Sequence, residues 1–160
     1  MKKIFVRFLL VNLVIFIGLV IYTNDMQMND NLELRVPILT KRETDELQDY
    51  DIFTKEILIK IHLSKLQAKI IKNKIDKNEN WKNTKLDERI DERMSFFSYV
   101  GIYDKIPKLE NAKWISTNMN NGIPDKHSID YVIENHFFRN IGFGILDLDN
   151  NILYYYQYNS

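Results

Sequence analysis

An uninterrupted apolar run near the N-terminus constrains this chain more than any other feature. Between Phe8 and Tyr22 only Asn12 is polar, and three basic residues precede the run. A helix over residues 4–22 would be about 28 Å long, close to the hydrocarbon thickness of a bilayer. We therefore expect residues 1–24 to form an uncleaved membrane anchor.

Two other interpretations of the run stay open. A cleaved signal peptide has the same basic start and apolar centre but ends in small residues. Here the run ends in Ile21, Tyr22 and Thr23. A buried helix of a globular core is the second alternative. The chain has no cysteine, which excludes lipid attachment at a signal-peptide cysteine.

The charges around the run predict its orientation. Lys2, Lys3 and Arg7 precede it, and the following residues 23–34 contain acids but no Lys or Arg. Basic residues beside a first span stay on the cytoplasmic side of a membrane. We expect a single-pass protein of the cell membrane, with its N-terminus in the cytoplasm and its C-terminal domain outside.

Composition narrows the class of partner. The chain of 160 residues has 22 basic and 22 acidic side chains, so the part beyond the anchor is slightly acidic. Such a charge does not fit nucleic-acid binding. The length beyond the anchor suits one domain. Frequent Asn and a preference for Lys over Arg are typical of AT-rich bacterial genomes, and favour a Gram-positive cell surface.

A polar segment follows the anchor. Residues 25–49 are rich in Asn, Asp, Gln and Glu, which predicts a polar linker. Within it, alternating apolar residues over 32–36 are compatible with an edge strand, and residues 40–50 with one or two helical turns. The extracytoplasmic domain is then expected over residues 50–160.

The first half of that domain is predicted as a strand followed by two helices. Apolar residues occupy alternate positions from Ile57 on, which predicts a strand over residues 53–63 with one buried face. Ser64 opens a capping box, and a helix is expected from there to about residue 78. A second amphipathic helix is expected near residues 86–97.

The second half is predicted to complete an antiparallel sheet. Trp114 marks a short strand, and residues 128–135 a short helix. Residues 137–148 and 152–158 flank an Asp-Asn-Asn turn, which predicts a C-terminal β-hairpin. The expected fold is α+β: a membrane helix, then a small antiparallel sheet with helices packed on one face.

The hairpin turn imitates a metal site. Asp147, Asp149 and Asn151 alternate like the first ligands of a calcium loop. The sixth position, however, is Ile152 where Gly is needed, and the twelfth is Tyr158 where a bidentate Glu belongs. We interpret the segment as a turn, and expect neither a metal nor a cofactor.

One loop contains the residue types of nucleophilic catalysis. His127 lies among Asp125, Ser128 and Asp130. Side chains adjacent in sequence usually point in different directions, and the chain has no Gly-x-Ser-x-Gly elbow. We expect no catalytic residue, and keep a small cell-envelope hydrolase using His127 as an alternative.

Carboxylates cluster on the helix expected near residues 86–97. Paired carboxylates serve glycoside hydrolysis. Here they alternate with basic residues, which favours ion pairs along a solvated helix face. The acids are Asp87, Glu88, Asp91 and Glu92, and the bases are Lys85, Arg89 and Arg93.

Tyrosines in the last strand give the strongest recognition signal. Tyr154, Tyr156 and Tyr158 alternate with Tyr155 and Gln157, so the two sets point to opposite faces of the sheet. Tyrosine suits a protein interface because it combines a large contact area with a hydroxyl group. If the first set packs in the core, the second lines an open face. The partner-binding residues expected there are Trp114, Tyr155 and Gln157, although strand aromatics also serve purely as packing residues.

In layout, the chain resembles the TipC-type immunity proteins: a basic start, one anchor, and one small exported α+β domain with an aromatic sheet. The resemblance implies protection of Gram-positive bacteria from exported toxins. We expect a non-enzymatic, membrane-tethered module that binds an exported toxin or envelope protein. A structural or sensory accessory that assembles through Asn12 in the membrane is a further alternative.

Overall fold

The structure is a computed structural model, and part of the chain can be described. The described residues are 10–13, 26–37, 40–49, 54–83, 88, 92, 101–119, 125–128, 130 and 140–159.

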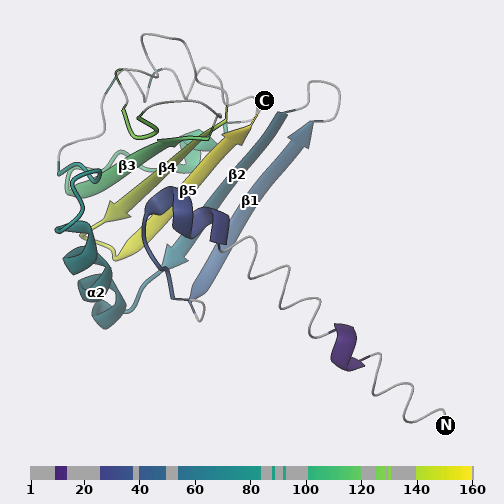
Figure 1. Ribbon diagram of the computed structural model, residues 1–160, viewed down its shortest axis with the longest axis horizontal. Helices are drawn as coiled ribbons and strands as arrows, with labels where there is room; N and C mark the ends of the chain where they lie inside the picture. Colours follow the sequence, from purple (N-terminus) through teal and green to yellow (C-terminus); the bar gives the residue numbers. More distant parts are fainter. Residues whose placement is uncertain are drawn as a thin grey trace.

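An antiparallel sheet of five strands forms the centre of the molecule (Figure 1). The strand order is β1-β2-β5-β4-β3, and every neighbouring pair is antiparallel. The strands are β1 (Lys41–Asp49), β2 (Thr54–His62), β3 (Ala112–Asn118), β4 (Ile141–Asp147) and β5 (Ile152–Asn159). With helices packed beside this sheet, the expected α+β class is confirmed.

The central strand β5 divides the core into two layers. Leu153 and Tyr155 belong to one cluster of buried side chains, whereas Tyr154, Tyr156 and Tyr158 belong to a second. Successive side chains of a strand point to opposite faces, so these clusters lie on the two sides of the sheet. Both faces of β5 are therefore buried.

Helix α2 (Lys65–Ile75) covers one end of the first face. The Ser64 side chain accepts a hydrogen bond from the Gln67 backbone N–H, and the Gln67 side chain accepts one from the Ser64 N–H. This capping box confirms the predicted start of the helix. Ala68, Ile71 and Ile75 form its buried side.

The N-terminal residues 26–36 cover the middle of the same face. Residues 26–32 are helical and lie against the sheet in front of its central strands (Figure 1). Met28, Leu32, Leu34 and Val36 are at most 4% exposed and join the core cluster of α2. This segment is an integral part of the domain.

That finding corrects the prediction of a polar linker over residues 25–49. The alternating residues 32–36 do not form an edge strand, because residues up to 32 are helical and all three apolar side chains face the core. Residues 41–49 do not form helical turns but strand β1, which pairs with β2 along its whole length. The domain therefore begins well before residue 50.

The second face is covered in part by a short 3-10 helix, η1 (Tyr103–Lys105). The Tyr103 ring meets the Tyr156 ring edge to face, with centroids 5.2 Å apart and planes 75° apart. Phe143 and Trp114 belong to the same cluster. Helix α2 and helical residues 26–32 therefore pack on the first face of the sheet, whereas η1 packs on the second.

The predicted C-terminal hairpin is confirmed. Strands β4 and β5 pair across a turn at residues 148–151, in which Asn151 has a φ of 55°. The Asp147 carboxylate accepts hydrogen bonds from the backbone N–H groups of Asp149 and Asn150, at 2.9 and 3.0 Å. The carboxylate therefore holds the turn together.

Several expected elements lie outside the described residues. The apolar run over residues 4–22 is described only at 10–13, which are helical and exposed. Among the described residues no helix is long and apolar enough to span a bilayer. Of the helices expected near 86–97 and 128–135, only Glu88, Glu92, Ser128 and Asp130 are described; Ser128 is not helical, and the other three are.

A glycine on β4 lets residues 26–32 approach the sheet. A Cβ added to Gly144 would collide with Leu32 Cδ2, and would lie 3.1 Å from Ile115 Cγ2 and 3.2 Å from Trp81. At Gly142, two positions away on the same face, the nearest atom to an added Cβ is 3.6 Å away. Position 144 therefore requires glycine, because any side chain there would overlap with Leu32.

We predict that Gly144→Ala lowers the free energy of unfolding by about 1–3 kcal/mol, because Leu32 must move away from an overpacked site. The measurement is urea unfolding of the full chain in detergent, followed by tryptophan fluorescence. Gly142→Ala is the matched control and should change stability by less than about 1 kcal/mol. Equal losses in the two variants would contradict this account of residues 26–32.

Candidate functional site

The three predicted partner-binding residues do not share an open face. Tyr155 is 3% exposed, Trp114 5% and Gln157 5%. In the sheet register Trp114 lies opposite Ile145 and in line with Tyr154, whereas Tyr155 lies opposite Gly144. Trp114 therefore points to the face opposite that of Tyr155 and Gln157. Each set borders its own cavity.

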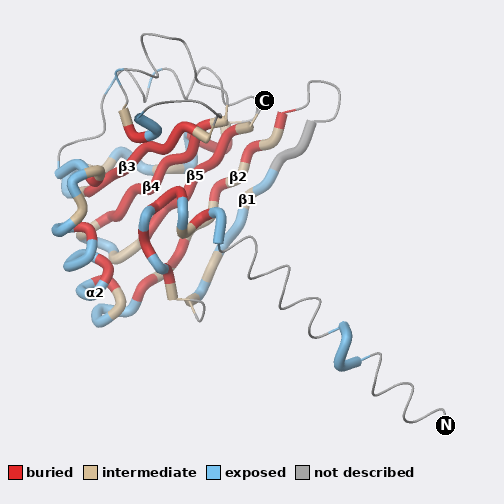
Figure 2. Tube along the Cα trace, in the orientation of Figure 1, coloured by how far each residue is buried: buried red, intermediate tan, exposed pale blue. Residues whose placement is uncertain are grey.

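Tyr155 and Gln157 border an open cavity of about 260 Å³ on the first face, here called the sheet hollow. It lies between the start of helical residues 26–32 and the strands β1, β2 and β5. Figure 2 shows that exposure rises from β5 across β2 to β1, so the cover of this face ends here. The other lining residues are Gln27, Met28, Arg42, Thr44, Glu46, Lys55, Ile57 and Ile59.

The floor of the sheet hollow is apolar. Ile57 and Ile59 on β2 are only half-buried, whereas Leu58, which points to the opposite face, is fully buried. The prediction that the odd positions of β2 form its one buried face is therefore wrong in the first half of the strand, where Glu56 and Leu58 on the other face are fully buried. Ile57 and Ile59 line a cavity that is open to solvent.

The rim of the sheet hollow is charged and polar. Lys55 Nζ and Glu46 Oε1 form an ion pair at 2.9 Å across β1 and β2. Arg42 donates a hydrogen bond from Nε to Thr40 Oγ1 at 3.4 Å. An apolar centre inside a polar rim is the usual anatomy of a protein interface.

Tyr155 is held rigidly at the inner wall. Its hydroxyl accepts a hydrogen bond from Asn31 Nδ2 at 2.7 Å and donates one to Gln157 Oε1 at 2.8 Å. Burial raises the pKa of this hydroxyl to about 12, although the Asn31 bond opposes the shift. The group stays protonated at neutral pH and acts as a structural link between helical residues 26–32 and the sheet.

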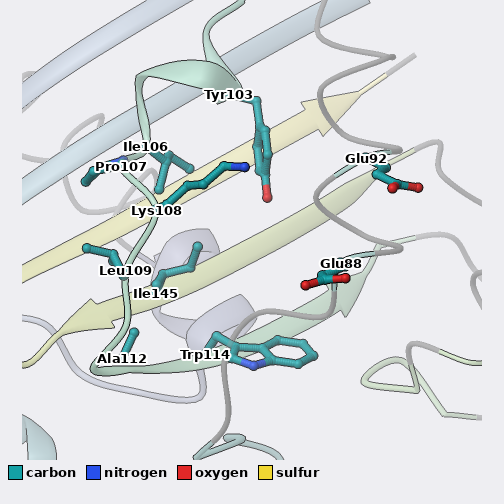
Figure 3. A pocket seen from close by; sticks show the side chains of 10 residues that line it. All are labelled: Glu88, Glu92, Tyr103, Ile106, Pro107, Lys108, Leu109, Ala112, Trp114 and Ile145. Atoms are coloured by element: carbon teal, nitrogen blue, oxygen red, sulfur yellow. The ribbon is translucent and has the colours of Figure 1, made fainter.

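Trp114 borders a second cavity, of about 200 Å³, on the opposite face, here called the Trp114 pocket. In Figure 3 the apolar side chains of Ile106, Leu109 and Ile145 lie on one side, and the carboxylates of Glu88 and Glu92 on the other. Tyr103 and Trp114 lie between these two groups. Pro107, Lys108 and Ala112 complete the lining.

The ion pairs expected along the acidic helix stay a prediction, because the basic partners Lys85, Arg89 and Arg93 lie outside the described residues. Glu88 and Glu92 are exposed, and within the described part of the chain neither forms an ion pair. They are one helical turn apart and therefore lie on the same side of the helix. The remaining acids and bases of that helix lie outside the described residues.

The loop considered as an alternative catalytic site, around His127, forms a structural clamp. The buried His127 ring has Nδ1 at 2.7 Å from the Ser116 carbonyl oxygen and Nε2 at 2.8 Å from Glu33 Oε1. Both ring nitrogens are therefore engaged by groups that hold the fold together. Asp125 accepts from the His127 backbone N–H at 3.0 Å, not from the ring.

This arrangement does not activate a nucleophile. The nearest hydroxyl, Thr117 Oγ1, lies 3.3 Å from His127 Nδ1 but donates its own proton to the Asn31 carbonyl at 2.6 Å. Each ring nitrogen of His127 has its shortest contact with another acceptor, the Ser116 carbonyl or the Glu33 carboxylate. Asp130, the other carboxylate considered from the sequence, is exposed.

Glu33 links three segments of the domain. Its carboxylate accepts hydrogen bonds from Asn78 Nδ2 at 3.0 Å and Asn80 Nδ2 at 2.9 Å, in addition to the His127 bond. Partial burial alone would raise its pKa. The bonds from Asn80, Asn78 and His127, and the charge of His127, outweigh burial and lower the pKa from 4.5 to about 2.

The described residues contain no group of three or more His, Cys, Asp or Glu side chains arranged to hold a metal ion. The carboxylates considered as calcium ligands have other partners, since Asp147 caps its own turn and Asp149 Oδ1 accepts from Asn111 Nδ2 at 2.7 Å.

Sequence reasoning missed most of the sheet hollow. It identified Tyr155 and Gln157 but interpreted Ile57 and Ile59 as core, and assigned Met28 to a linker. The sequence contained part of the evidence for the hollow, because β2 has a row of isoleucines on one face. Ile57 and Ile59 in this row are not fully covered by α2 and helical residues 26–32.

Comparison of the chain with protein-family models, with curated proteins and with solved structures finds no match. The site must therefore be interpreted from its own geometry.

We predict that acid unfolds this protein partly through Glu33. A carboxyl whose pKa is lower in the folded state stabilises that state above pH 4.5, and the contribution is lost as the pH falls toward about 2. Glu33→Gln should therefore reduce the loss of unfolding free energy between these pH values, measured by urea titrations at several pH values. Glu79→Gln, an exposed acid outside the clamp, controls for the change in net charge. An unchanged pH profile in Glu33→Gln would contradict the prediction.

Proposed function

We propose that the chain is a non-enzymatic, membrane-tethered module that binds a protein outside the cytoplasmic membrane through its sheet hollow. The observation that carries the proposal is the half-buried pair Ile57 and Ile59 at the floor of an open, charge-rimmed cavity. Burial of these side chains by a partner would remove apolar surface from water.

The edge of the sheet supports the same proposal. Strand β1 pairs with β2 on one side, and no strand among the described residues pairs with its other side. Its side chains Arg42, Thr44 and Glu46 form the outer rim of the hollow. Charged residues on an edge strand discourage pairing with arbitrary strands, so they favour a selective partner.

The contacts of His127 support a binding role over hydrolysis. The ring bridges Ser116 and Glu33, and its neighbour Thr117 is bonded to Asn31. These contacts join residues 31–33 to β3 and the loop at residues 125–128. The hydrogen bonds therefore fix residues 31–33 against the face of the sheet that contains the hollow.

The proposed tether would hold the hollow close to the lipid. Residues 4–22 form the proposed membrane span, and only residues 23–25 separate it in sequence from helical residues 26–32. Three extended residues reach about 10 Å. Gln27 and Met28 line the hollow, so a partner at the outer surface of the membrane would meet it at high local concentration.

An immunity role is the specific form of this proposal. A toxin that acts at the outer face of the membrane would be captured before it reaches its target. The layout resemblance to TipC-type immunity proteins supports this form, as does the short separation in sequence between the proposed tether and the lining residues Gln27 and Met28.

The proposed topology is testable because the chain has no cysteine. Lys77 is exposed in the turn after α2. We predict that Lys77→Cys reacts with a membrane-impermeant maleimide in intact cells, whereas Lys3→Cys reacts only after permeabilisation. Mass-tag gel shifts measure the labelling. Protection of Lys77→Cys in intact cells would place the domain in the cytoplasm and refute the proposal.

The binding face is testable by photo-crosslinking in cells. We predict that a benzoylphenylalanine at position 57 forms a discrete adduct with one exported or envelope protein. The matched control is position 70, an isoleucine 47% exposed on α2 and away from the hollow. Mass spectrometry identifies the adduct.

Substitutions at the same two positions then separate binding from folding. Ile57→Asp should weaken binding of the identified partner at least about tenfold, as expected for a residue at the centre of an interface. Ile70→Asp should leave binding unchanged. If the partner is a toxin, cells that produce it should survive with the wild-type chain and die with Ile57→Asp. Identical behaviour of the two variants would exclude the sheet hollow as the site.

A further inference from the structure

Helix α2 presents a pair of apolar side chains to solvent. Leu66 is 68% exposed and Ile70 is 47% exposed. Among the described residues from 26 onward, the only other exposed large apolar side chain is Met26. Single exposed apolar residues are ordinary, but Leu66 and Ile70 are one helical turn apart and form one patch.

This pair points away from the core. Leu66 and Ile75 are separated by about two and a half helical turns, so their side chains lie on opposite sides of α2. Ile75 is buried in the core cluster of the first face. Figure 2 shows the outer side of α2 exposed to solvent. No residue of α2 lines the sheet hollow or the Trp114 pocket, so the pair lies on a projecting surface outside both cavities.

The charge around the pair is positive. Helix α2 contains four lysines, at positions 65, 69, 72 and 74, and no acidic residue. Lys72 pairs with Asp76 at 2.9 Å, whereas the other three form no ion pair with a described residue. Lys69 lies one turn from Leu66, and Lys74 lies one turn from Ile70. Ammonium groups without an ion-pair partner in the described part of the chain therefore surround the apolar pair.

We propose that this patch of α2 rests on the anionic lipid surface of the membrane to which the chain is tethered. Leu66 and Ile70 enter the boundary between headgroups and acyl chains, as the apolar residues of interfacial helices do. The long stems of Lys65, Lys69 and Lys74 keep their ammonium groups at the lipid phosphates. Anionic lipid attracts lysines that lie next to a membrane, so charge and apolar contact act together.

The shape of the patch favours lipid over an acidic protein. Protein interfaces concentrate their binding energy in side chains that fill closed pockets, and a projecting pair offers no such pocket. Fluid lipid can close around a convex surface. Helical residues 26–32, which follow the proposed membrane span, pack on the same face of the sheet as α2. The proposed tether would therefore keep α2 at a high local concentration of lipid, where a weak attraction suffices.

The inference rests on the tether of the proposed function but does not involve the protein partner. The tether alone keeps the domain at the membrane. Loss of the lipid contact would change how the domain is oriented, while the sheet hollow would stay accessible. Ile70→Asp is therefore still expected to bind the protein partner.

The experiment uses the full chain with one NBD fluorophore on Leu66→Cys, which is the only cysteine of that variant. The chain is reconstituted in phosphatidylcholine nanodiscs, with or without phosphatidylglycerol, that contain a nitroxide-labelled lipid. We expect the NBD emission to shift to shorter wavelength, and the nitroxide to quench it, only in the anionic nanodiscs. Raising the salt concentration from about 0.1 M to about 1 M should weaken both changes, because the Debye length falls from about 10 Å to about 3 Å.

A matched probe controls for unspecific approach of the domain to lipid. Asp104 is exposed on η1, which packs on the second face of the sheet, opposite α2. The NBD fluorophore on Asp104→Cys should be neither shifted nor quenched in either nanodisc.

Variants of the Leu66→Cys chain identify the charges responsible. Lys69→Gln combined with Lys74→Gln should lower the docking equilibrium constant at least about tenfold, because each lysine adds to the attraction. The control Lys60→Gln with Lys108→Gln removes two lysines on the second face, and should dock like the parent chain. Equal midpoints of urea unfolding show that each variant is folded.

Four results would overturn the inference. They are no quenching at position 66 in anionic nanodiscs, equal quenching with and without phosphatidylglycerol, equal quenching at position 104, and full docking by the double variant of Lys69 and Lys74. A shift caused by added polyglutamate but not by anionic lipid would instead identify an acidic protein surface as the occupant.

Failure of the tether can be distinguished from failure of the patch. A chain that does not enter nanodiscs would refute the proposed tether. The same labelled chain, added to vesicles with and without phosphatidylglycerol, would then decide whether the patch binds lipid. None of these results bears on crosslinking at Ile57 in the sheet hollow.

Discussion

Strand β5 pairs with a neighbour on each side and buries side chains on both of its faces, and the remaining structure has to cover it. Leu153 and Tyr155 need a cover on one face, and Tyr154, Tyr156 and Tyr158 on the other. A sheet with one solvated face would leave a row of large tyrosines in water. The domain therefore has a layer on each side of its sheet, and each layer leaves a cavity at its margin.

The cover of the first face comes mainly from residues that precede the sheet. Leu32 fits above Gly144, where no side chain competes for the space, and its carbonyl accepts from Trp81. Polar contacts then fix the segment at its end: Asn31 bonds to Tyr155 and Thr117, and Glu33 to His127. Apolar packing supplies the attraction and these directional bonds supply the position, since hydrogen bonds lose their strength when misaligned.

Local patterns predicted the elements whose evidence is local. Alternation predicted β2, the capping box at Ser64 predicted α2, and the Asp-Asn-Asn turn predicted the hairpin. Strand β1 was missed because Lys41–Asp49 is almost wholly polar, as an edge strand can be when few of its side chains reach the core. Residues 26–36 were misassigned because the segment is rich in polar residues and the alternation over 32–36 indicated an edge strand, whereas the burial of Leu32 depends on distant Gly144. Likewise, Trp114 and Tyr155 could not be assigned to opposite faces without the register of β3, β4 and β5.

The two cavities differ in what they could recognise, and the difference follows from the layers that form them. The sheet hollow exists because helical residues 26–32 cover β5 but stop short of β1, which leaves Ile57 and Ile59 beside a paired, balanced rim of Glu46 and Lys55. Shape and apolar area would therefore dominate recognition of the proposed partner there. The Trp114 pocket instead has the carboxylates of Glu88 and Glu92, which form no ion pair with another described residue, beside the rings of Tyr103 and Trp114. Since β5 lies between them, one partner can reach both only by wrapping around an edge of the sheet. Simultaneous occupancy would then add specificity without demanding a large continuous interface.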